Sequence, residues 1–312
     1  MKDLLRTADL GRDDLRLLIE LGDRFKKNPY ERPDALRNDT VVLYFAKPST
    51  RTRISFETAV ARLGGTPIGV GPDELQLGRG ETIEDTARVI SRYARAFVIR
   101  TYKDEDVRRF AAAASIPVIN ALTDLHHPLQ SLADLMTLRE KLGGWEGRKL
   151  AYVGDGNNVA HSLMEAAALA GLSIAVATPD GYAPNPSIVA RARALAAVTG
   201  ATLELTADPQ AAVRGADAVY TDVWVSMGVP EAERPARLKA LAPYQVNDAL
   251  MRRAAPGALF MHCLPDHRGE EVTASVVDGP RSVVFDQAEN RLHTAKAVLF
   301  ALVERMVKGA NG

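Results

Sequence analysis

The sequence predicts an α/β protein with two doubly wound parallel sheets, one in each half of the chain. At 312 residues the chain is about twice the length of a typical domain of ~150 residues. Short apolar runs rich in β-branched residues alternate with longer amphipathic segments in both halves, which is typical of parallel sheets. The pattern restarts after a long helical stretch near the middle of the chain. We therefore place a domain boundary there, between residues 143 and 144.

The first half opens with an amphipathic helix predicted over residues 7–27 and a buried strand over residues 41–45. Pro48 ends this strand, and Ser49 can cap a helix that runs to Gly64. The alternation then continues with strands predicted at 66–70, 96–100 and 116–120, and helices at 82–93 and 104–114.

A long helix predicted from Pro128 to Gly143 leads into the second half. Strands are predicted there at 149–153, 173–177, 202–205, 218–221, 258–261 and 283–285, with helices ending at Gly171 and spanning 188–199. The last helix follows the second sheet and can return to the first domain. We expect a first domain of residues 1–143 completed by a helix at 288–312, a second domain of residues 144–287, and two interdomain helices.

Composition limits the classes of partner and compartment. Lys and Arg together number 39, as do Asp and Glu, so the chain lacks the charge excess of a nucleic-acid or membrane-surface binder. The single cysteine, Cys263, cannot form an internal disulfide, and the first residues carry no apolar leader. No run approaches the length of a membrane span. These features predict a cytoplasmic protein that acts on small molecules.

Polar residues follow directly after six of the predicted strands. These residues are Ser49 to Arg53, Arg100, His126-His127, Asn157-Asn158, Asp222 and His262-Cys263. In open parallel sheets, ligands bind beyond the carboxyl ends of the strands. The sequence therefore predicts one active-site crevice between the two sheets.

The segment Ser49-Thr50-Arg51-Thr52-Arg53 has the composition of an anion site. It places two guanidinium groups and three hydroxyls at the start of a helix, where unpaired backbone N–H groups also attract anions. A capped surface helix with ordinary arginines is the alternative. The density of donors directly after a buried strand favours a phosphate site, and nothing in it requires a metal.

Three other features are ambiguous when taken singly. A histidine before proline, such as His127, is more often structural, and a buried cysteine such as Cys263 often acts as a small hydrophobe. The position of Cys263 directly after a strand and beside His262 favours a polar role. The run Gly154-Asp155-Gly156 resembles the start of a dinucleotide-binding fingerprint, but its third glycine is replaced by Val159, which argues against a nicotinamide cofactor.

Four motifs together resemble those of the ornithine carbamoyltransferases, in the aspartate/ornithine carbamoyltransferase superfamily. They are Ser49-Thr50-Arg51-Thr52-Arg53, His127-Pro128-Leu129-Gln130, the segment from Asp222 to Gly228, and His262-Cys263-Leu264-Pro265. The resemblance extends over nearly the whole chain. The first two motifs are shared by carbamoyltransferases in general, whereas Ser226-Met227-Gly228 and Cys263 favour ornithine over aspartate as acceptor.

The resemblance implies a reaction and an assembly. The carbamoyl group of carbamoyl phosphate would pass to the side-chain amine of L-ornithine, giving L-citrulline and phosphate, in arginine biosynthesis. No cofactor and no metal are implied. The family is typically a homotrimer or a higher assembly of trimers, with active sites near subunit boundaries.

The resemblance also assigns site residues. Carbamoyl phosphate would be bound by Ser49, Thr50, Arg51, Thr52, Gln76, Arg100, His127, Gln130, Cys263, Leu264 and Arg291. Ornithine would be bound by Asn158, Asp222, Ser226 and Met227, and the catalytic residues would be Cys263, Arg51, Arg100 and His127. The loop around Gln76 aligns least securely with the family pattern.

The chemistry needs positive charge at both ends of carbamoyl phosphate. Arg51 and the helix N-terminus suit the phosphate, while Thr52, Arg100 and His127 are candidate donors to the carbonyl oxygen. Cys263 and Asp222 are both candidates to orient the amine and take its proton. Domain closure over both substrates, with the loop from Ser226 to Pro230 as a lid, would align them, and carbamoyl phosphate would bind first.

Other functions remain open at this point. Another carbamoyltransferase could use aspartate, putrescine or N-acetylornithine, although the carboxylate of Asp222 would repel aspartate. A noncatalytic anion-binding protein and a nicotinamide dehydrogenase are rivals from other classes.

Overall fold

The computed structural model describes residues 1–77, 80–226 and 229–310. It divides into two compact units, one of Met1–Met136 with Glu289–Gly312 and one of Thr137–Ala288. The chain passes between them inside helix α5 (Pro128–Leu142) and again inside helix α12 (Val284–Ala310), so two helices join the units. The boundary expected at 143/144 falls after the end of α5, whereas the units divide within that helix.

The first unit is built on a four-stranded parallel sheet of order β2-β1-β3-β4. Its strands are β1 (Thr40–Phe45), β2 (Thr66–Val70), β3 (Ala96–Arg100) and β4 (Val118–Leu122). From β1 the chain adds β2 on one side and then β3 on the other. The switch point between β1 and β3 is where such sheets bind ligands.

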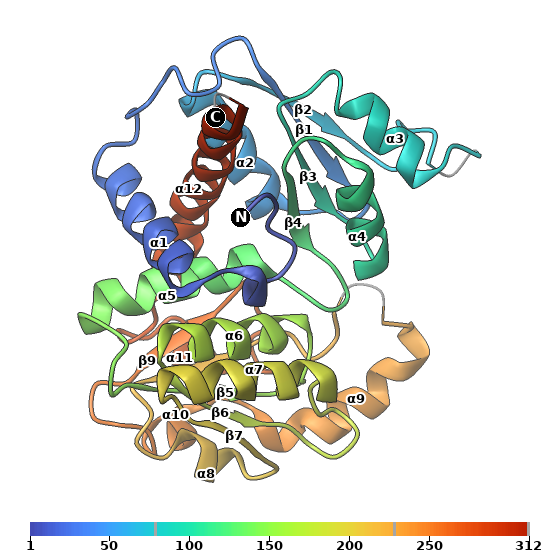
Figure 1. The fold of residues 1–312 in the computed structure, drawn as a ribbon. Coiled ribbons are helices and arrows are strands. Elements are labelled where there is room, and N and C mark those ends of the chain that lie inside the picture. Colours follow the sequence, from blue (N-terminus) through green and yellow to red (C-terminus); the bar gives the residue numbers. More distant parts are fainter. Residues whose placement is uncertain (78–79, 227–228, 311–312) are drawn as a thin grey trace. The chain divides into compact units, whose positions relative to one another are not determined.

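Helices cover both faces of this sheet. Figure 1 shows α3 (Ile83–Ile90) and α4 (Asp104–Ala113) on one side and α2 (Thr50–Arg62) and α12 on the other, with α1 (Arg12–Lys27) beyond them. On the α3 and α4 side, Tyr44 and Phe97 pack into the core, and the rings of Phe97 and Phe110 stack with centroids 4.0 Å apart. The buried strand and capped helix predicted around Ser49 are confirmed.

The second unit has a five-stranded parallel sheet of order β7-β6-β5-β8-β9. The strands are β5 (Lys149–Val153), β6 (Ser173–Ala177), β7 (Leu203–Thr206), β8 (Ala218–Thr221) and β9 (Leu259–His262). Here the strand order reverses between β5 and β8. The prediction of two doubly wound parallel sheets is confirmed.

Short and long helices surround the second sheet. Helices α6 (Asn158–Ala170) and α7 (Pro186–Thr199) pack together, and the core beside α8 (Pro209–Val213), α10 (Asp248–Met251) and α11 (Ala274–Val277) contains Val219 and Phe260 (Figure 1). Helix α9 (Arg234–Leu241) follows the segment after β8. The remaining elements are 3₁₀-helices at Thr7–Asp9, Glu231–Glu233 and Ala242–Tyr244.

The strand predicted at 283–285 is wrong. Ser282 makes only an isolated bridge to Phe260, and α12 starts at Val284. Val283 and Val284 are buried at the start of a helix. A short buried apolar run of this kind has the same composition as a buried strand, which is why the pattern was misleading.

Two predicted bounds also shift. The helix expected over residues 7–27 is a 3₁₀-turn followed by α1, which Gly11 precedes as N-cap. Strand β4 starts at Val118, after Pro117, which lacks an N–H for the sheet. No helix in the described residues has the length and apolar character that crossing a membrane requires.

Candidate active site

In the first unit, the N-terminus of α2 lies beyond the carboxyl end of β1, next to the switch point of the sheet. Ser49 caps this helix, because its hydroxyl accepts the backbone N–H of Thr52 at 3.3 Å. Thr50 is exposed, Ser49 and Arg51 are half-buried, and Thr52 is buried. Arg100 is the last residue of the neighbouring strand β3 and is also buried. The first turn of α2 therefore presents backbone donors beside basic side chains at this edge.

The charges of three arginines act on the buried imidazole of His127. Burial lowers the pKa of His127 well below its usual value of 6.5, and the charges of Arg291, Arg100 and Arg51 lower it further. The imidazole is therefore neutral near pH 7 and can donate or accept a hydrogen bond without adding charge. The three guanidinium groups, drawn from three distant parts of the sequence, make this region strongly positive. Such a region suits an anion.

A hydrogen-bond network fixes one of these arginines. Arg291 Nη1 donates to Gln130 Oε1 at 2.7 Å, and Nη2 donates to Thr52 Oγ1 at 3.0 Å. Gln130 Nε2 in turn donates to Asp134 Oδ1 at 2.8 Å. The structure thus brings together the predicted residues Thr52, Gln130 and Arg291. Sequence reasoning missed Asp134, although its position four residues after Gln130 on α5 puts both on one helical face.

Lys47 is a second residue that the sequence analysis missed. It lies in the connection from β1 to α2, and its side chain is buried, with Nζ 4.1 Å from the centroid of the Tyr102 ring. Burial lowers the pKa of Lys47, and the charge of Arg100 acts in the same direction. Its place directly before Pro48-Ser49 was the available signal. It adds a further cation to this end of the unit.

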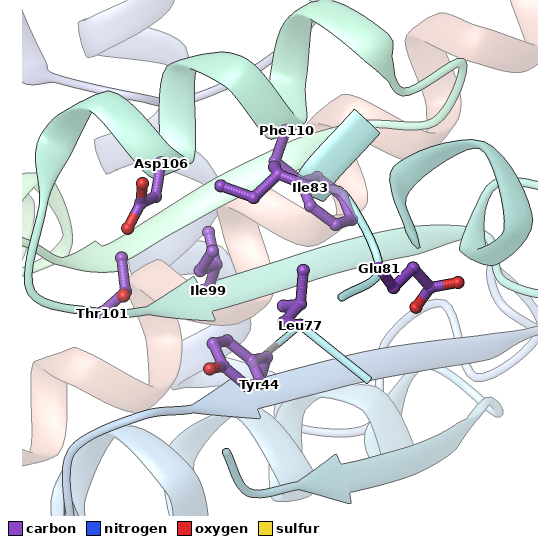
Figure 2. Close-up of a pocket in the computed structure, with 8 residues that line it drawn as sticks. All are labelled: Tyr44, Leu77, Glu81, Ile83, Ile99, Thr101, Asp106 and Phe110. Carbon is purple, nitrogen blue, oxygen red and sulfur yellow. The ribbon is translucent and has the colours of Figure 1, made fainter. Parts of the chain in front are cut away.

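The structure does not bring Gln76 together with the other predicted residues. Its side chain is exposed and makes no hydrogen bond within the described residues. A cavity of about 210 Å³ lies nearby in the first unit, and Figure 2 shows the side chains around it. It is lined by Tyr44, Leu77, Glu81, Ile83, Ile99, Thr101, Asp106 and Phe110. None of these is a predicted site residue, so this cavity is separate from the basic cluster.

In the second unit, Asp222 is the centre of a cluster at the carboxyl ends of the strands. The Cys263 thiol donates to Asp222 Oδ1 at 2.9 Å, and Asn157 Nδ2 donates to Asp222 Oδ2 at 2.7 Å. Asn157 also caps α6, because its Oδ1 accepts the N–H groups of Val159 and Ala160. The sequence analysis noted Asn157 only as part of a motif and assigned ornithine binding to Asn158. In the structure Asn158 is the first residue of α6.

A buried pair supports the Cys263 segment. His262 Nδ1 accepts the backbone N–H of Leu264 at 2.8 Å, so the ring proton lies on Nε2, which faces Glu271 Oε1 at 3.1 Å. Both His262 and Glu271 are fully buried. Leu264 has a φ of 57°, a backbone conformation that this hydrogen bond helps to hold. Sequence reasoning missed Glu271, which no local pattern links to His262.

Arg237 of α9 connects two loops at the same end of the sheet. Its Nη2 pairs with Asp155 Oδ2, its Nε donates to the carbonyl of Trp224 at 3.0 Å, and its guanidinium lies 5.0 Å from the Tyr182 ring centroid. Burial raises the pKa of Asp155 to about 6 despite the nearby Arg237, and the charge of Asp222 contributes. The segment that carries Ser226 is thereby anchored to the turn after β5.

The other residues predicted for this unit, Ser226, Met227 and Leu264, lie close in sequence to Asp222 or Cys263. Ser226 is half-buried and is the last described residue before a gap, and Met227 lies outside the described residues. Leu264 is partly buried and packs against the core of the unit. In the run Gly154-Asp155-Gly156, the second glycine is required by packing. A Cβ at Gly156 would lie 2.4 Å from the backbone nitrogen of Pro184.

The two units therefore gather complementary groups. The first collects cations and helix N–H donors, which suit a phosphate and a developing oxyanion. The second collects a carboxylate, a thiol and an amide, which suit an amine.

Comparison with known proteins gives the family. The carbamoyl-P binding domain model of aspartate/ornithine carbamoyltransferase matches residues 2–140, and the Asp/Orn binding domain model of that family matches residues 146–302. The ornithine carbamoyltransferase of Acidothermus cellulolyticus is 51% identical over 304 residues, which cover 97% of this chain and 97% of that protein. The solved structure of the ornithine carbamoyltransferase from Pyrococcus furiosus has a TM-score of 0.92 and 51% identity, with 96% of each chain covered. A structure from Giardia lamblia has a TM-score of 0.89 and 40% identity, with 97% of this chain and 98% of that chain covered. The resemblance inferred from the sequence is confirmed, and the chain belongs to the aspartate/ornithine carbamoyltransferase family.

Proposed function

We propose that this chain is an ornithine carbamoyltransferase that converts carbamoyl phosphate and L-ornithine to L-citrulline and phosphate. Full-length relatives at about half identity carry that name. The observation that best supports the substrate assignment is the group of three arginines around a neutral His127 in the unit that matches a carbamoyl-P binding domain.

Carbamoyl phosphate binds to the first unit in this proposal. Arg51, with the backbone N–H groups of the first turn of α2, holds the phosphate. Thr52, Arg100 and His127 face the carbonyl oxygen, where each donor contributes about 3 to 4 kcal/mol to stabilising the transition state. Gln130 and Arg291 hold one another and Thr52 in place. Ser49 completes the site, whereas Gln76, which lies apart from these residues, is assigned to it by the resemblance alone.

Ornithine binds to the second unit. Asp222 is the group that best matches a positively charged amine, and its contacts with Cys263 and Asn157 fix the direction of its oxygens. Asn158, Ser226 and Met227 hold the amino-acid end of the substrate, and Leu264 lines the reacting centre. Asp222 also disfavours aspartate, because two carboxylates would repel each other.

The amine must lose a proton before it attacks. At pH 7 an alkyl amine with a pKa of about 10.4 needs roughly 4.6 kcal/mol to become neutral. The cations of the first unit lower this cost by disfavouring a second positive charge. Asp222 or Cys263 takes the proton, and the lone pair of the amine then attacks the carbonyl carbon. The carbon–oxygen bond to phosphate breaks, and the phosphate leaves with that electron pair and takes up the second proton that the attacking nitrogen loses.

Alignment of the two substrates supplies the rest of the rate enhancement, an effect of up to about 7 to 11 kcal/mol. We propose that the substrates meet in a crevice between the two sheets and that carbamoyl phosphate binds first. We further propose that the protein works in arginine biosynthesis in the cytoplasm, without a cofactor, as a homotrimer or an assembly of trimers.

The test is citrulline formation from carbamoyl phosphate with ornithine, N-acetylornithine, putrescine and aspartate offered in parallel. Of the four acceptors, we expect only ornithine to react. For Arg51→Ala we expect a loss of at least a hundredfold in kcat/KM. Arg53→Ala is the matched control. Arg53 lies two residues after Arg51 on α2, is exposed and pairs with Glu57. Preference for another acceptor would leave the carbamoyl phosphate half intact and overturn the roles of Asp222 and Ser226. No turnover with any acceptor would overturn the enzyme proposal.

A further inference from the structure

A compact group of potential metal ligands lies in the turn that follows β9, at His267, Glu270 and Glu271. One ligand atom from each of the three lies within 4.8 Å of the other two. The closest approach recorded between their side chains is 3.6 Å, from His267 Nδ1 to Glu270 Oε2. His267 is 44% exposed, whereas Glu270 is 26% exposed and Glu271 is fully buried. The group is thus open to solvent on the histidine side and closed on the glutamate side.

Two carboxylate oxygens in this group lack hydrogen bonds. Glu271 Oε1 accepts from His262 Nε2 at 3.1 Å and from the backbone N–H of His267 at 2.6 Å. Glu271 Oε2 and Glu270 Oε2 are both buried and have no hydrogen-bond partner within the described residues. A buried carboxylate oxygen without a donor is costly. Something that attracts negative oxygen therefore belongs beside these two atoms.

We infer that His267, Glu270 and Glu271 form a binding site for a first-row divalent metal ion. One imidazole and two carboxylates are a ligand set of such ions, whereas calcium and magnesium prefer oxygen ligands alone. With three protein ligands in a five-residue turn and one face open, water completes the coordination. The site is distinct from the carbamoyl phosphate and ornithine residues, and the inference does not depend on the proposed function.

The surrounding charges are arranged to leave the site available. Arg234 pairs with Glu270 Oε1 and not with Oε2, the oxygen that lacks a hydrogen bond. Arg268 is directed to Asp266 and Asp278 instead. Arg234 on Glu270 and His262 on Glu271 orient the two glutamates, as outer-shell groups commonly do for metal ligands.

A rival ligand group, Asp222, His262 and Cys263, belongs to the candidate active site. Both ring nitrogens of His262 already have partners, Leu264 and Glu271, so that group would lose hydrogen bonds on taking up an ion. The two groups differ in chemistry, since only the active-site group contains a thiolate ligand. A spectroscopic probe can therefore distinguish them.

The experiment is a titration of the full-length protein with Co²⁺, followed by visible and near-ultraviolet absorption. We expect a saturable ligand-field spectrum of one bound ion without a thiolate-to-cobalt charge-transfer band. His267→Ala and the isosteric Glu270→Gln should each weaken Co²⁺ binding by at least tenfold. Cys263→Ser and Arg268→Ala are the controls and should leave the spectrum and the affinity unchanged. Circular dichroism of each variant verifies that it is folded.

Two results would overturn the inference. One is a spectrum with a charge-transfer band that Cys263→Ser abolishes, because the ion would then lie at the active-site thiol. The other is Co²⁺ binding that is absent in the wild-type protein or unchanged in both His267→Ala and Glu270→Gln. Using two ligand variants keeps the test decisive if one of them does not fold.

Discussion

Arg291 shows how one residue can organise a site from a distant part of the chain. It contacts Thr52 of α2 and Gln130 of α5, both far from it in sequence, within the first unit. The guanidinium is buried, so its two neutral acceptors must compensate for the water it has lost. Removing either acceptor should therefore affect stability as well as binding.

Thr52→Val tests this arrangement, because it removes the hydroxyl and keeps the shape of the side chain. A hydrogen bond to a charged group contributes about 1.5 to 3 kcal/mol, so the free energy of unfolding of the first unit should fall by that amount. The KM for carbamoyl phosphate should also rise. The measurements are urea unfolding and steady-state kinetics. Thr58→Val, at a half-buried position on the same helix that takes no part in this network, should change neither quantity. Equal behaviour of the two variants would contradict our interpretation.

His127 should make the folded state sensitive to acid. Burial, with the charges of Arg291, Arg100 and Arg51, holds its pKa well below 6.5 in the folded protein. The histidine of the unfolded chain binds a proton at the usual pKa of 6.5. The free energy of unfolding therefore decreases as the pH falls below about 6.5. The loss of stability approaches about 1.4 kcal/mol per pH unit for one proton.

The comparison is between wild type and His127→Gln, with urea unfolding measured from pH 8 to pH 5. At pH 8 the substitution should cost stability through lost packing and hydrogen bonding. That difference in stability should shrink as the pH falls through 6.5. Only the wild type has an imidazole that is protonated in the unfolded state and neutral in the folded state, so only the wild type loses stability in this way. A difference that stays constant down to pH 5 would mean that His127 titrates alike in both states.

At the scale of elements, helix α9 holds the segment between β8 and Ser226. Arg237 donates to the carbonyl of Trp224 and pairs with Asp155, so one side chain links α9, the turn after β5 and the segment after β8. A lysine has the same charge but cannot make both contacts with one planar group.

Arg237→Lys should therefore raise the KM for ornithine by about tenfold, the equivalent of about 1.4 kcal/mol. The KM for carbamoyl phosphate should stay within twofold, because the contacts of Arg237 lie in the second unit. Steady-state kinetics with each substrate varied in turn provide the measurement. Lys239→Ala is the control, since Lys239 is exposed on the same helix. An equal rise in both KM values would show a general loss of structure instead.

The elements also show where local patterns are reliable. The strand before Ser49 and the capped helix after it were predictable because their signals lie within a few residues of one another. The run at 283–285 was misread because three apolar residues fit a buried strand as well as the buried start of a helix. The structure distinguishes the two, because the bridge from Phe260 to Ser282 is isolated and α12 begins at Val284.

At the scale of the whole molecule, the first unit is discontinuous and the second is continuous. The first needs Glu289–Gly312 to complete it, and α12 contributes the buried side chains Val298, Leu299, Leu302 and Val303. Each such side chain stabilises the fold by about 1.5 to 3 kcal/mol. Their sum is comparable with the whole stability of a typical domain, about 5 to 15 kcal/mol.

We therefore expect a fragment of residues 137–288 to fold alone and a fragment of residues 1–136 to remain unfolded. Circular dichroism and cooperative urea unfolding are the measurements. Adding a peptide of residues 289–310 to the first fragment should restore part of its structure. A cooperative transition of residues 1–136 alone would show that α12 is dispensable for that unit.

The sequence by itself determined the α/β class, most elements and the position of polar residues at the carboxyl ends of strands. It also determined the family, because the motifs at 49–53, 127–130 and 262–265 are local. Each of these properties depends on periodicity, capping or composition over a short window, where neighbours in sequence are neighbours in space.

Only the tertiary structure decided which distant residues meet. The contact of Arg291 with Thr52, the support of Gln130 by Asp134 and the pairing of His262 with Glu271 could not be predicted locally. The same holds for the two buried carboxylate oxygens, Glu270 Oε2 and Glu271 Oε2, that accept no hydrogen bond from the described part of the chain. Such contacts depend on the order of the strands and on the return of α12, and the free energy that sets them comes from burial over the whole unit.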